Sequence, residues 1–257
     1  MADKRKMQMR PGDARPRVKR CGSVIVLYDP DLVDESWLPE CFDPAWWSQR
    51  GSLQSPLGGR GSAWEIDSPE LSWVLRAYCR GGLIRHFSYD HYLWLGLQQT
   101  RSWREWWLLY WLFRQRLPVP RPIAAMVARH GYYYTAALIT RKIEAVTLAE
   151  ALAQGPLPER TWFGIGENIR HFHGMGIDHA DLNAHNILLD SRHDSYLLDF
   201  DKSRRRRPKD FWRKRNLRRL KRSLLKLRKN RSIAVGTQDW QALLEGYGSI
   251  TCSKEKE

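Results

Sequence analysis

A polar loop followed by two short apolar runs is the feature that most constrains this chain. The loop reads His179-Ala180-Asp181-Leu182-Asn183-Ala184-His185-Asn186, and Asp199 follows 13 residues after Asn186. Ile187–Leu189 and Tyr196–Leu198 read as short strands joined by a polar turn. A single Asp or Asn in such a loop is usually a turn former. The combination of residue types, spacing and strand context indicates a chemical site instead.

The loop resembles the kinase catalytic loop H-R-D-x-x-x-x-N, and Asp199-Phe200 resembles the start of the D-F-G metal motif. The resemblance implies that Asp181 is the catalytic base and that Asn186 and Asp199 hold Mg²⁺ on the phosphates of ATP. The chemistry agrees, because phosphoryl transfer depends mainly on positioning and charge neutralisation. Mg²⁺ prefers oxygen ligands, and all three side chains provide them.

The N-terminal half carries weaker counterparts of the other kinase elements. A glycine cluster resembles a nucleotide-covering loop, although glycine clusters are most often plain turns. Arg76 stands where kinases have a lysine that binds phosphates, and Arg80 is the rival for this role. Glu105 lies in the next predicted helix, either to orient that cation or as a solvated charge. The residues expected at the nucleotide are Gly58, Gly59, Gly61, Arg76 and Glu105.

A narrower resemblance, over roughly residues 50–205, is to the bacterial 3-deoxy-D-manno-octulosonic acid (Kdo) kinases. The matching segments are Trp73–Leu83, Thr100–Glu105, Leu117–Pro122 and His179–Leu188. The resemblance implies ATP-dependent phosphorylation of the 4-hydroxyl of a Kdo sugar on a lipid A precursor. It also implies a peripheral location on the cytoplasmic side of the inner membrane. Asp201 replaces the glycine of D-F-G and no A-P-E segment follows, which disfavours a protein acceptor.

Periodicity along the chain predicts an α+β, protein-kinase-like fold with two lobes. We expect a loose basic tail over 1–20, a β-rich N-lobe with one long helix over 21–140, and a mainly helical C-lobe over 141–257. The C-lobe holds the catalytic loop 179–186, the metal motif 199–201 and a basic helical segment 204–231. Predicted strands are Ser23–Tyr28, Trp64–Ile66, Leu71–Tyr78, Ile123–Val127 and Tyr132–Thr140, and predicted helices are Thr100–Arg116, Thr147–Gln154, Glu159–His173 and Phe211–Asn230.

Charge is concentrated in the segment 204–231. The chain has 43 Lys and Arg against 28 Asp and Glu, a net charge of +15. The segment carries all of this excess, with 16 Lys and Arg and one acid, Asp210. A leucine stripe on the same helix predicts packing against the C-lobe. The basic face is then a solvated surface, an anionic-membrane contact or a nucleic-acid site. We expect the membrane and no nucleic acid, since few aromatic residues interleave with the cations.

The remaining features narrow the compartment and the class of protein. Four cysteines stand far apart, and neither a signal peptide nor an 18-residue apolar run is present. We therefore expect reduced thiols in a protein made and kept on the cytoplasmic side. We also expect a monomer. Two alternatives stay open: a sugar phosphotransferase similar to the aminoglycoside or choline kinases, and a kinase-like binding protein without activity.

Overall fold

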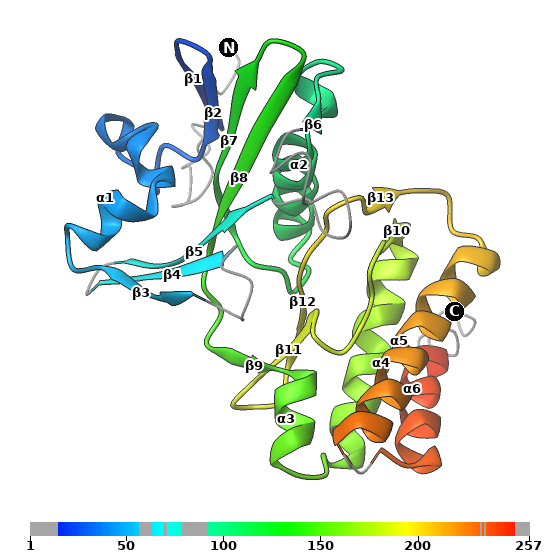
Figure 1. Cartoon of the computed structure of the whole chain (residues 1–257). Helices are drawn as coiled ribbons and strands as arrows, with labels where there is room; N and C mark the ends of the chain where they lie inside the picture. Colours follow the sequence, from blue (N-terminus) through cyan, green and yellow to red (C-terminus); the bar gives the residue numbers. More distant parts are fainter. Residues whose placement is uncertain are drawn as a thin grey trace, which may run out of the picture. The chain divides into compact units, whose positions relative to one another are not determined.

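The computed structural model describes residues 15–56, 63–68, 71–78, 92–231, 233 and 235–249. They form two compact units, and the mixed α+β class is the predicted one (Figure 1). The first unit holds the described residues up to Trp107 together with Arg121–Lys142. The second holds Leu108–Pro120 and the described residues from Ile143 onward.

An antiparallel eight-stranded sheet forms the body of the first unit, in the order β1-β2-β7-β8-β5-β4-β3 with β6 also paired to β8. The predicted hairpins are confirmed: β4 pairs with β5, and β7 pairs with β8 around Gly131, whose φ of 60° suits a glycine. The strands are β1 (Arg17–Cys21), β2 (Val24–Tyr28), β3 (Leu53–Pro56), β4 (Ala63–Ser68), β5 (Leu71–Ala77), β6 (Tyr92–Leu93), β7 (Pro122–His130) and β8 (Tyr133–Arg141).

The Trp/Pro-rich stretch between β2 and β3 folds into three short helices, η1 (Glu35–Trp37), η2 (Glu40–Phe42) and α1 (Pro44–Ser48). Their side chains build an aromatic cluster on one face of the sheet. Trp46 and Trp47 meet edge to face at 4.7 Å between ring centroids, and Trp47 meets Trp73 of β5 at 5.8 Å. Edge-to-face contact is a favoured geometry for such rings. After β6 come η4 (Leu97–Gln99) and α2 (Arg101–Arg114), the long helix predicted from residue 100.

Part of the segment predicted as a loose basic tail is ordered. Arg17–Arg20 were assigned to it, yet they form most of β1 and pair with β2 from Arg17 opposite Tyr28 to Cys21 opposite Val24. The strand is at the sheet edge and carries three cations, of which Arg17 and Arg20 are exposed, so its composition resembles a tail. Backbone pairing with the apolar β2 is what orders it.

In its described residues, the second unit combines the C-terminal end of α2 and four further helices with two small sheets. The sheets have the orders β12-β11-β9 and β10-β13. Helix α3 begins with a capping box between Thr147 and Glu150. The elements are β9 (Ala145–Thr147), α3 (Leu148–Gln154), α4 (Glu159–Gly174), β10 (Ile177–Asp178), β11 (Ile187–Asp190), β12 (Ser195–Leu197), β13 (Arg204–Arg205), α5 (Asp210–Arg231) and α6 (Thr237–Ser249).

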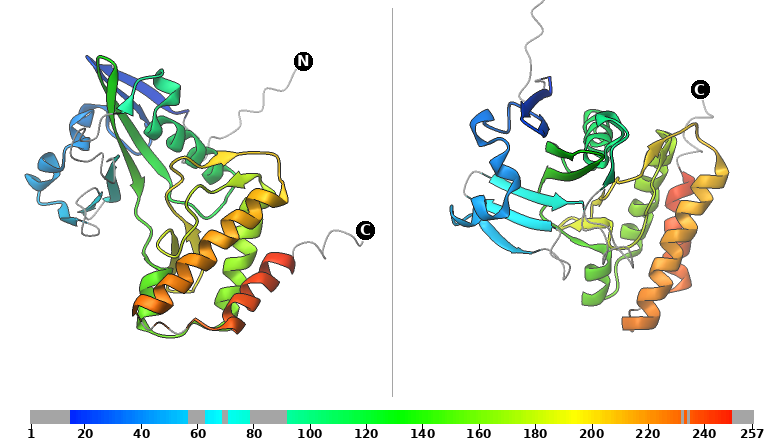
Figure 2. Two further views of the ribbon diagram at one scale, coloured as in Figure 1. Left: turned by 45° about the vertical axis from the view of Figure 1, so that its right-hand side comes forward. Right: turned by 45° about the horizontal axis from the view of Figure 1, so that its top comes forward.

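Helices α4 and α6 lie side by side, with α5 near them (Figure 2). Two glycines allow the close approach of α4 and α6. A Cβ on Gly166 would lie 2.0 Å from the Leu243 carbonyl oxygen, and one on Gly246 would lie 2.0 Å from that of Phe163. The predicted leucine stripe of α5 is buried, as expected, through Leu217, Leu220, Leu224 and Leu227. Among the described residues, no helix has both the length and the apolar character needed to span a membrane.

Candidate active site

The hairpin of β11 and β12 brings Asn186 and Asp199 to the same end of two paired strands. Ile187 lies opposite Leu197, and the Leu198 N–H donates to the Asn186 carbonyl oxygen at 2.9 Å. Asp199 follows directly, with φ at 58°. Asp tolerates this left-handed conformation better than most residues, and such backbone positions cluster at functional sites. Two predicted metal ligands, 13 residues apart in sequence, are thus neighbours along the backbone pairing.

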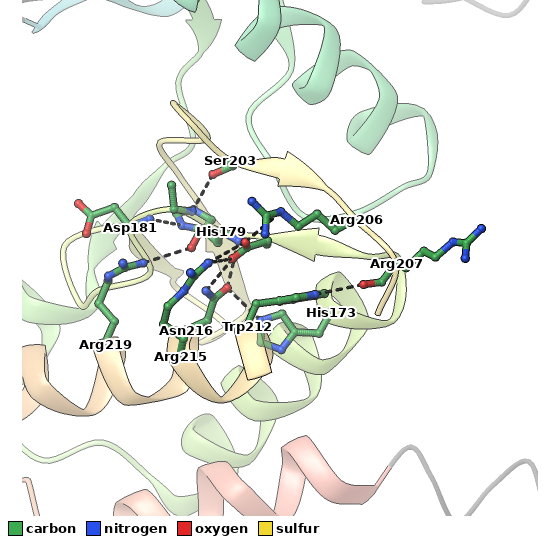
Figure 3. Close-up of polar contacts among 12 residues, drawn as sticks. His173, His179, Asp181, Ser203, Arg206, Arg207, Trp212, Arg215, Asn216 and Arg219 are labelled. Atoms are coloured by element: carbon green, nitrogen blue, oxygen red, sulfur yellow. Dashed lines mark hydrogen bonds and ion pairs between the residues drawn. The ribbon is translucent and has the colours of Figure 1, made fainter. Parts of the chain in front are cut away.

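A buried imidazole holds the backbone of Asp181. The His179 side chain lies between two partners: its Nε2 is 2.9 Å from the Leu198 carbonyl oxygen, and its Nδ1 is 3.2 Å from the Asp181 backbone nitrogen (Figure 3). Only the neutral ring protonated on Nε2 satisfies both, donating to the carbonyl and accepting from the Asp181 N–H. Burial lowers the pKa of His179, which favours the same neutral form. The Asp181 side chain is exposed.

The side chain of Asn186 also binds this loop. Its Nδ2 donates to the Asp181 carbonyl oxygen at 2.8 Å, and Asn183 Nδ2 donates to the same oxygen at 3.2 Å. Because a carbonyl only accepts, the amide nitrogen of Asn186 must face it, and Oδ1 is the atom able to ligate a cation. One amide oxygen and one carboxylate fit Mg²⁺, which takes few protein ligands and completes its shell with phosphates and water. No larger group of His, Cys, Asp and Glu suited to a metal occurs among the described residues.

Asn216 of α5 supports the loop from below and is fully buried (Figure 3). Its Oδ1 accepts from the His179 backbone N–H at 3.0 Å and lies 3.2 Å from His173 Nε2. Its Nδ2 donates to Asp178 Oδ1 at 3.0 Å. One side chain therefore ties helix α5 to helix α4, to β10 and to the start of the catalytic loop.

Charged and hydroxyl groups complete this support. Arg215 Nη2 donates to both oxygens of the buried Asp178 carboxylate at 3.1 and 2.8 Å, and Arg206 Nε lies 3.4 Å from it. Arg219 Nη1 donates to the His179 carbonyl oxygen at 3.4 Å. The hydroxyls of Ser203 and Ser223 accept from the backbone N–H groups of Ala180 and Ala184 respectively, at 3.0 and 3.2 Å.

Sequence reasoning missed these supporting residues. One signal existed: Asn216 and Ser223 lie seven positions apart, and every other residue of 213–229 is a cation or a leucine. A seven-residue spacing places both on one helical face. Uncharged polar groups beside a buried stripe indicate hydrogen bonds to a neighbouring backbone.

In the first unit the structure brings together Arg76 and Glu105. Arg76 Nη2 donates to Glu105 Oε1 at 2.6 Å, and the hydroxyl of Tyr78 donates to Oε2 at 2.5 Å. Glu105 is 3% exposed, so the solvated-charge alternative is wrong. Tyr78 was not predicted. The glycines Gly58, Gly59 and Gly61 and the rival cation Arg80 lie outside the described residues.

Comparison with known proteins identifies the family. The description "Lipopolysaccharide kinase (Kdo/WaaP) family" matches residues 44–247. A 3-deoxy-D-manno-octulosonic acid kinase of Stenotrophomonas maltophilia (strain K279a) is 48% identical over 226 residues, 86% of this chain and 88% of the relative. Another of Xylella fastidiosa (strain M23) is 45% identical over 206 residues, 80% of this chain and 82% of the relative. The predicted resemblance is confirmed, and the chain belongs to the lipopolysaccharide kinase (Kdo/WaaP) family.

Proposed function

We propose that this chain phosphorylates the 4-hydroxyl of a Kdo sugar on a lipid A precursor, using ATP and Mg²⁺. Its relatives carry the name Kdo kinase and match over most of both chains. The single observation that carries the proposal is the fixed backbone of Asp181. Its N–H is bound by a buried neutral imidazole and its carbonyl by two asparagine amides, while its carboxylate remains exposed.

The role assigned to Asp181 is to accept a proton from the acceptor hydroxyl. As the sugar oxygen attacks the γ-phosphorus of ATP, a new O–P bond forms and the bond to the β,γ-bridging oxygen breaks, leaving ADP. The proton of the attacking hydroxyl passes to an Asp181 carboxylate oxygen. A fixed backbone favours this step because the place from which the base extends is set before the substrate binds.

The metal and nucleotide contacts are assigned to three further side chains. Asn186 Oδ1 and the Asp199 carboxylate would hold Mg²⁺, whose charge neutralises the phosphate oxygens during transfer. Arg76, held by Glu105, would contact nucleotide phosphates. Gly58, Gly59 and Gly61 keep their predicted role as the loop covering the nucleotide.

The acceptor is a lipid-anchored sugar, so we also propose that the protein binds the cytoplasmic face of the inner membrane peripherally. The support is the exposed basic face of α5. Four of its five leucines are buried. Its exposed cations include Lys214, Arg218, Lys221, Arg222, Lys226 and Arg228. Anionic lipids attract such segments with about 1 kcal/mol per Lys or Arg near the surface.

The test is direct phosphorylation. Purified protein is incubated with Mg-ATP and a Kdo-bearing lipid A precursor, and mass spectrometry looks for one added phosphate on the Kdo unit. Fragmentation or NMR then locates it at the 4-hydroxyl. Reactions with the same precursor lacking Kdo, and with EDTA in place of Mg²⁺, are the controls. No added phosphate, or phosphorylation of an aminoglycoside or choline instead, would overturn the proposal.

A further inference from the structure

Four large apolar side chains stand together on the surface of the first unit, where β6 meets the β7–β8 turn. They are Leu93 (55% exposed), Leu95 (72%), Tyr132 (82%) and Tyr133 (49%), and we name them the tip cluster. Leu93 pairs with Tyr133 across the two strands, and the Trp94 N–H donates to the Tyr132 carbonyl oxygen at 2.9 Å. The four residues therefore lie close together along the paired backbone. Grouped exposed apolar side chains mark interaction sites more often than scattered ones do.

The backbone beneath the cluster is firmly held. The next pair along the strands, Tyr92 and Tyr134, has ring centroids 5.5 Å apart, and Tyr134 is buried. The Arg101 N–H, at the start of α2, donates to the Tyr134 hydroxyl at 3.1 Å. The tip cluster thus stands on the β6–β8 strand pair, which is anchored to helix α2 (Figure 1). Its four side chains are exposed. A preorganised surface loses little conformational entropy when it binds.

The rim of the cluster is basic. The guanidinium of Arg129 lies 5.0 Å above the ring of Trp94, and its Nε donates to the Gly131 carbonyl oxygen at 3.0 Å. The Arg129 N–H donates to the Ser23 carbonyl oxygen at 3.0 Å, which brings the β1–β2 turn and the exposed Arg20 nearby. The segments 15–28, 92–104 and 121–142 contain no acidic residue. If a second copy of this chain docked here through the same surface, cations would face cations and repel each other. The basic rim therefore favours an anionic partner.

We propose that the tip cluster inserts into the interfacial region of an anionic lipid bilayer. Tyrosine and tryptophan favour the membrane–water interface because their rings are apolar and their polar ends stay hydrated. Leucines reach further into the acyl region, and Arg129 and Arg20 face the anionic headgroups. The inference rests on the proposed function, since a membrane-anchored acceptor requires an enzyme at the membrane. It assigns the first unit its own lipid contact, separate from helix α5.

The experiment compares vesicle binding by two double variants. Leu95→Ser/Tyr132→Ser removes the two most exposed members of the cluster. Leu244→Ser/Val146→Ser is the matched control, because both residues are 41% exposed and lie in the second unit. Cosedimentation with vesicles containing phosphatidylglycerol should show at least tenfold weaker binding for the cluster variant and unchanged binding for the control. Circular dichroism and thermal unfolding establish that both variants are folded.

A second measurement reports insertion itself. Lipids brominated near the headgroup quench tryptophans that reach the interface, so wild type should lose more fluorescence than Trp94→Phe on binding. Equal quenching of these two proteins, or equal vesicle binding by wild type and the cluster variant, would overturn the inference. So would a larger species of wild type than of the cluster variant in gel filtration, because the cluster would then cover a second copy.

Activity separates this inference from the proposed function. The cluster variant should phosphorylate a soluble, delipidated Kdo acceptor at the wild-type rate. If wild type phosphorylates no Kdo acceptor, the proposed function fails whatever the vesicles show. If wild type is active and the cluster variant binds vesicles normally, only the present inference fails.

Discussion

His179 shows how one side chain fixes both the shape and the charge of the catalytic loop. Its two ring nitrogens are used by a carbonyl and by the N–H of Asp181, so a second proton would abolish the bond to Asp181. Burial disfavours that second proton. The loop therefore depends on a ring that stays neutral near pH 7, and a positive charge beside Asp181 is avoided.

For Asp181 we expect that Asp181→Asn retains ATP binding and loses about 10²–10⁴-fold in turnover, the usual contribution of a general base. The asparagine keeps the size of the side chain but accepts no proton. Turnover is measured with the Kdo acceptor, and ATP binding by calorimetry. Asp194→Asn, an exposed position in the β11–β12 turn, is the matched control. A variant that retains half of the wild-type rate would contradict the assignment.

For Asp199 we expect that Asp199→Ala weakens binding of Mg-ATP as well as catalysis, because the lost carboxylate is a proposed metal ligand. Calorimetry with and without Mg²⁺ measures this: the Mg²⁺-dependent gain in ATP affinity should shrink in the variant. Asp194→Ala should keep the full gain. Equal Mg-ATP affinity in Asp199→Ala and wild type would show that the carboxylate does not bind the metal.

His173 makes stability depend on pH. Burial lowers the pKa of His173 from 6.5 to about 4, with Arg213 adding to this and the Asn216 hydrogen bond opposing it. Between pH 6.5 and about pH 4, His173 is therefore protonated in the unfolded chain and neutral in the folded chain. The contribution of His173 to the free energy of unfolding is fully present above about pH 6.5. It is lost as the pH drops toward 4, by at most about 1.4 kcal/mol per pH unit.

The check is urea unfolding at pH 7.5 and pH 5. His173→Gln is expected to be less stable than wild type at pH 7.5 and to lose less on acidification. His171→Gln, exposed on the same helix, is expected to behave like wild type. An unchanged pH dependence in His173→Gln would exclude His173 as the group responsible.

At the scale of elements, the packing of α4 on α6 depends on which glycine faces the neighbour. Gly164 and Gly166 lie two residues apart on α4, yet a Cβ on Gly164 would meet nothing within 4 Å, while one on Gly166 would meet backbone atoms of α6 at 2.0 Å. Backbone atoms cannot move aside as a flexible side chain does. The two positions are a matched pair in one helix.

We expect Gly166→Ala to lower the free energy of unfolding by about 1–3 kcal/mol through overpacking. Gly164→Ala should raise it by up to about 1 kcal/mol, because alanine is the better helix former. Thermal or urea unfolding gives both values. Equal effects of the two substitutions would mean that α4 and α6 do not approach each other this closely.

Helix α5 has two faces with different partners. Its inner face meets the catalytic loop through Asn216, Ser223 and Arg219. Arg215 binds Asp178, directly before that loop. Its exposed face carries cations that bond to none of these groups. Charge can therefore be removed from the exposed face without touching the loop, provided that Arg215 and Arg219 are left in place.

At the scale of the whole molecule, the net charge of +15 is concentrated in one segment. We expect Arg222→Gln/Lys226→Gln to weaken binding to anionic vesicles roughly thirtyfold, since each cation near the surface contributes about 1 kcal/mol. Arg160→Gln/Arg192→Gln removes the same charge outside α5 and should have a smaller effect. Wild-type binding should itself weaken in 1 M salt, where the Debye length is about 3 Å against about 10 Å at 0.1 M.

In the α5 variant, the rate of phosphorylation should fall less for a delipidated acceptor than for the membrane-bound acceptor. Cosedimentation and the two kinase assays check this together. Vesicle binding that does not change with salt concentration, or that is equal in the α5 variant and wild type, would contradict this prediction. The exposed face of α5 would then be a solvated surface without a lipid contact.

The sequence by itself determined the elements whose signals are local. Helix α2 and the β7–β8 hairpin follow from periodicity and from the His130-Gly131 turn, and their observed bounds differ from the predicted ones by only a few residues. The spacing between Asp181, Asn186 and Asp199 indicated a kinase, because the order of these residue types along the chain is itself the motif. The four matching segments narrowed this to the Kdo kinases, and the family match confirms it. The buried leucine stripe of α5 was predicted for the same reason: helical spacing is visible within one segment.

Only the tertiary structure decided which distant groups meet. Asn216 reaches His179 across 37 residues and His173 across 43, and neither separation leaves a periodic trace. From the sequence, Glu105 could equally be a surface charge or an ion-pair partner. It is buried and bound to Arg76 and Tyr78, so it is an ion-pair partner. Arg17–Arg20 resemble a tail until β2 pairs with them. Hydrogen bonds between distant segments depend on how the chain closes on itself, and local composition does not record that.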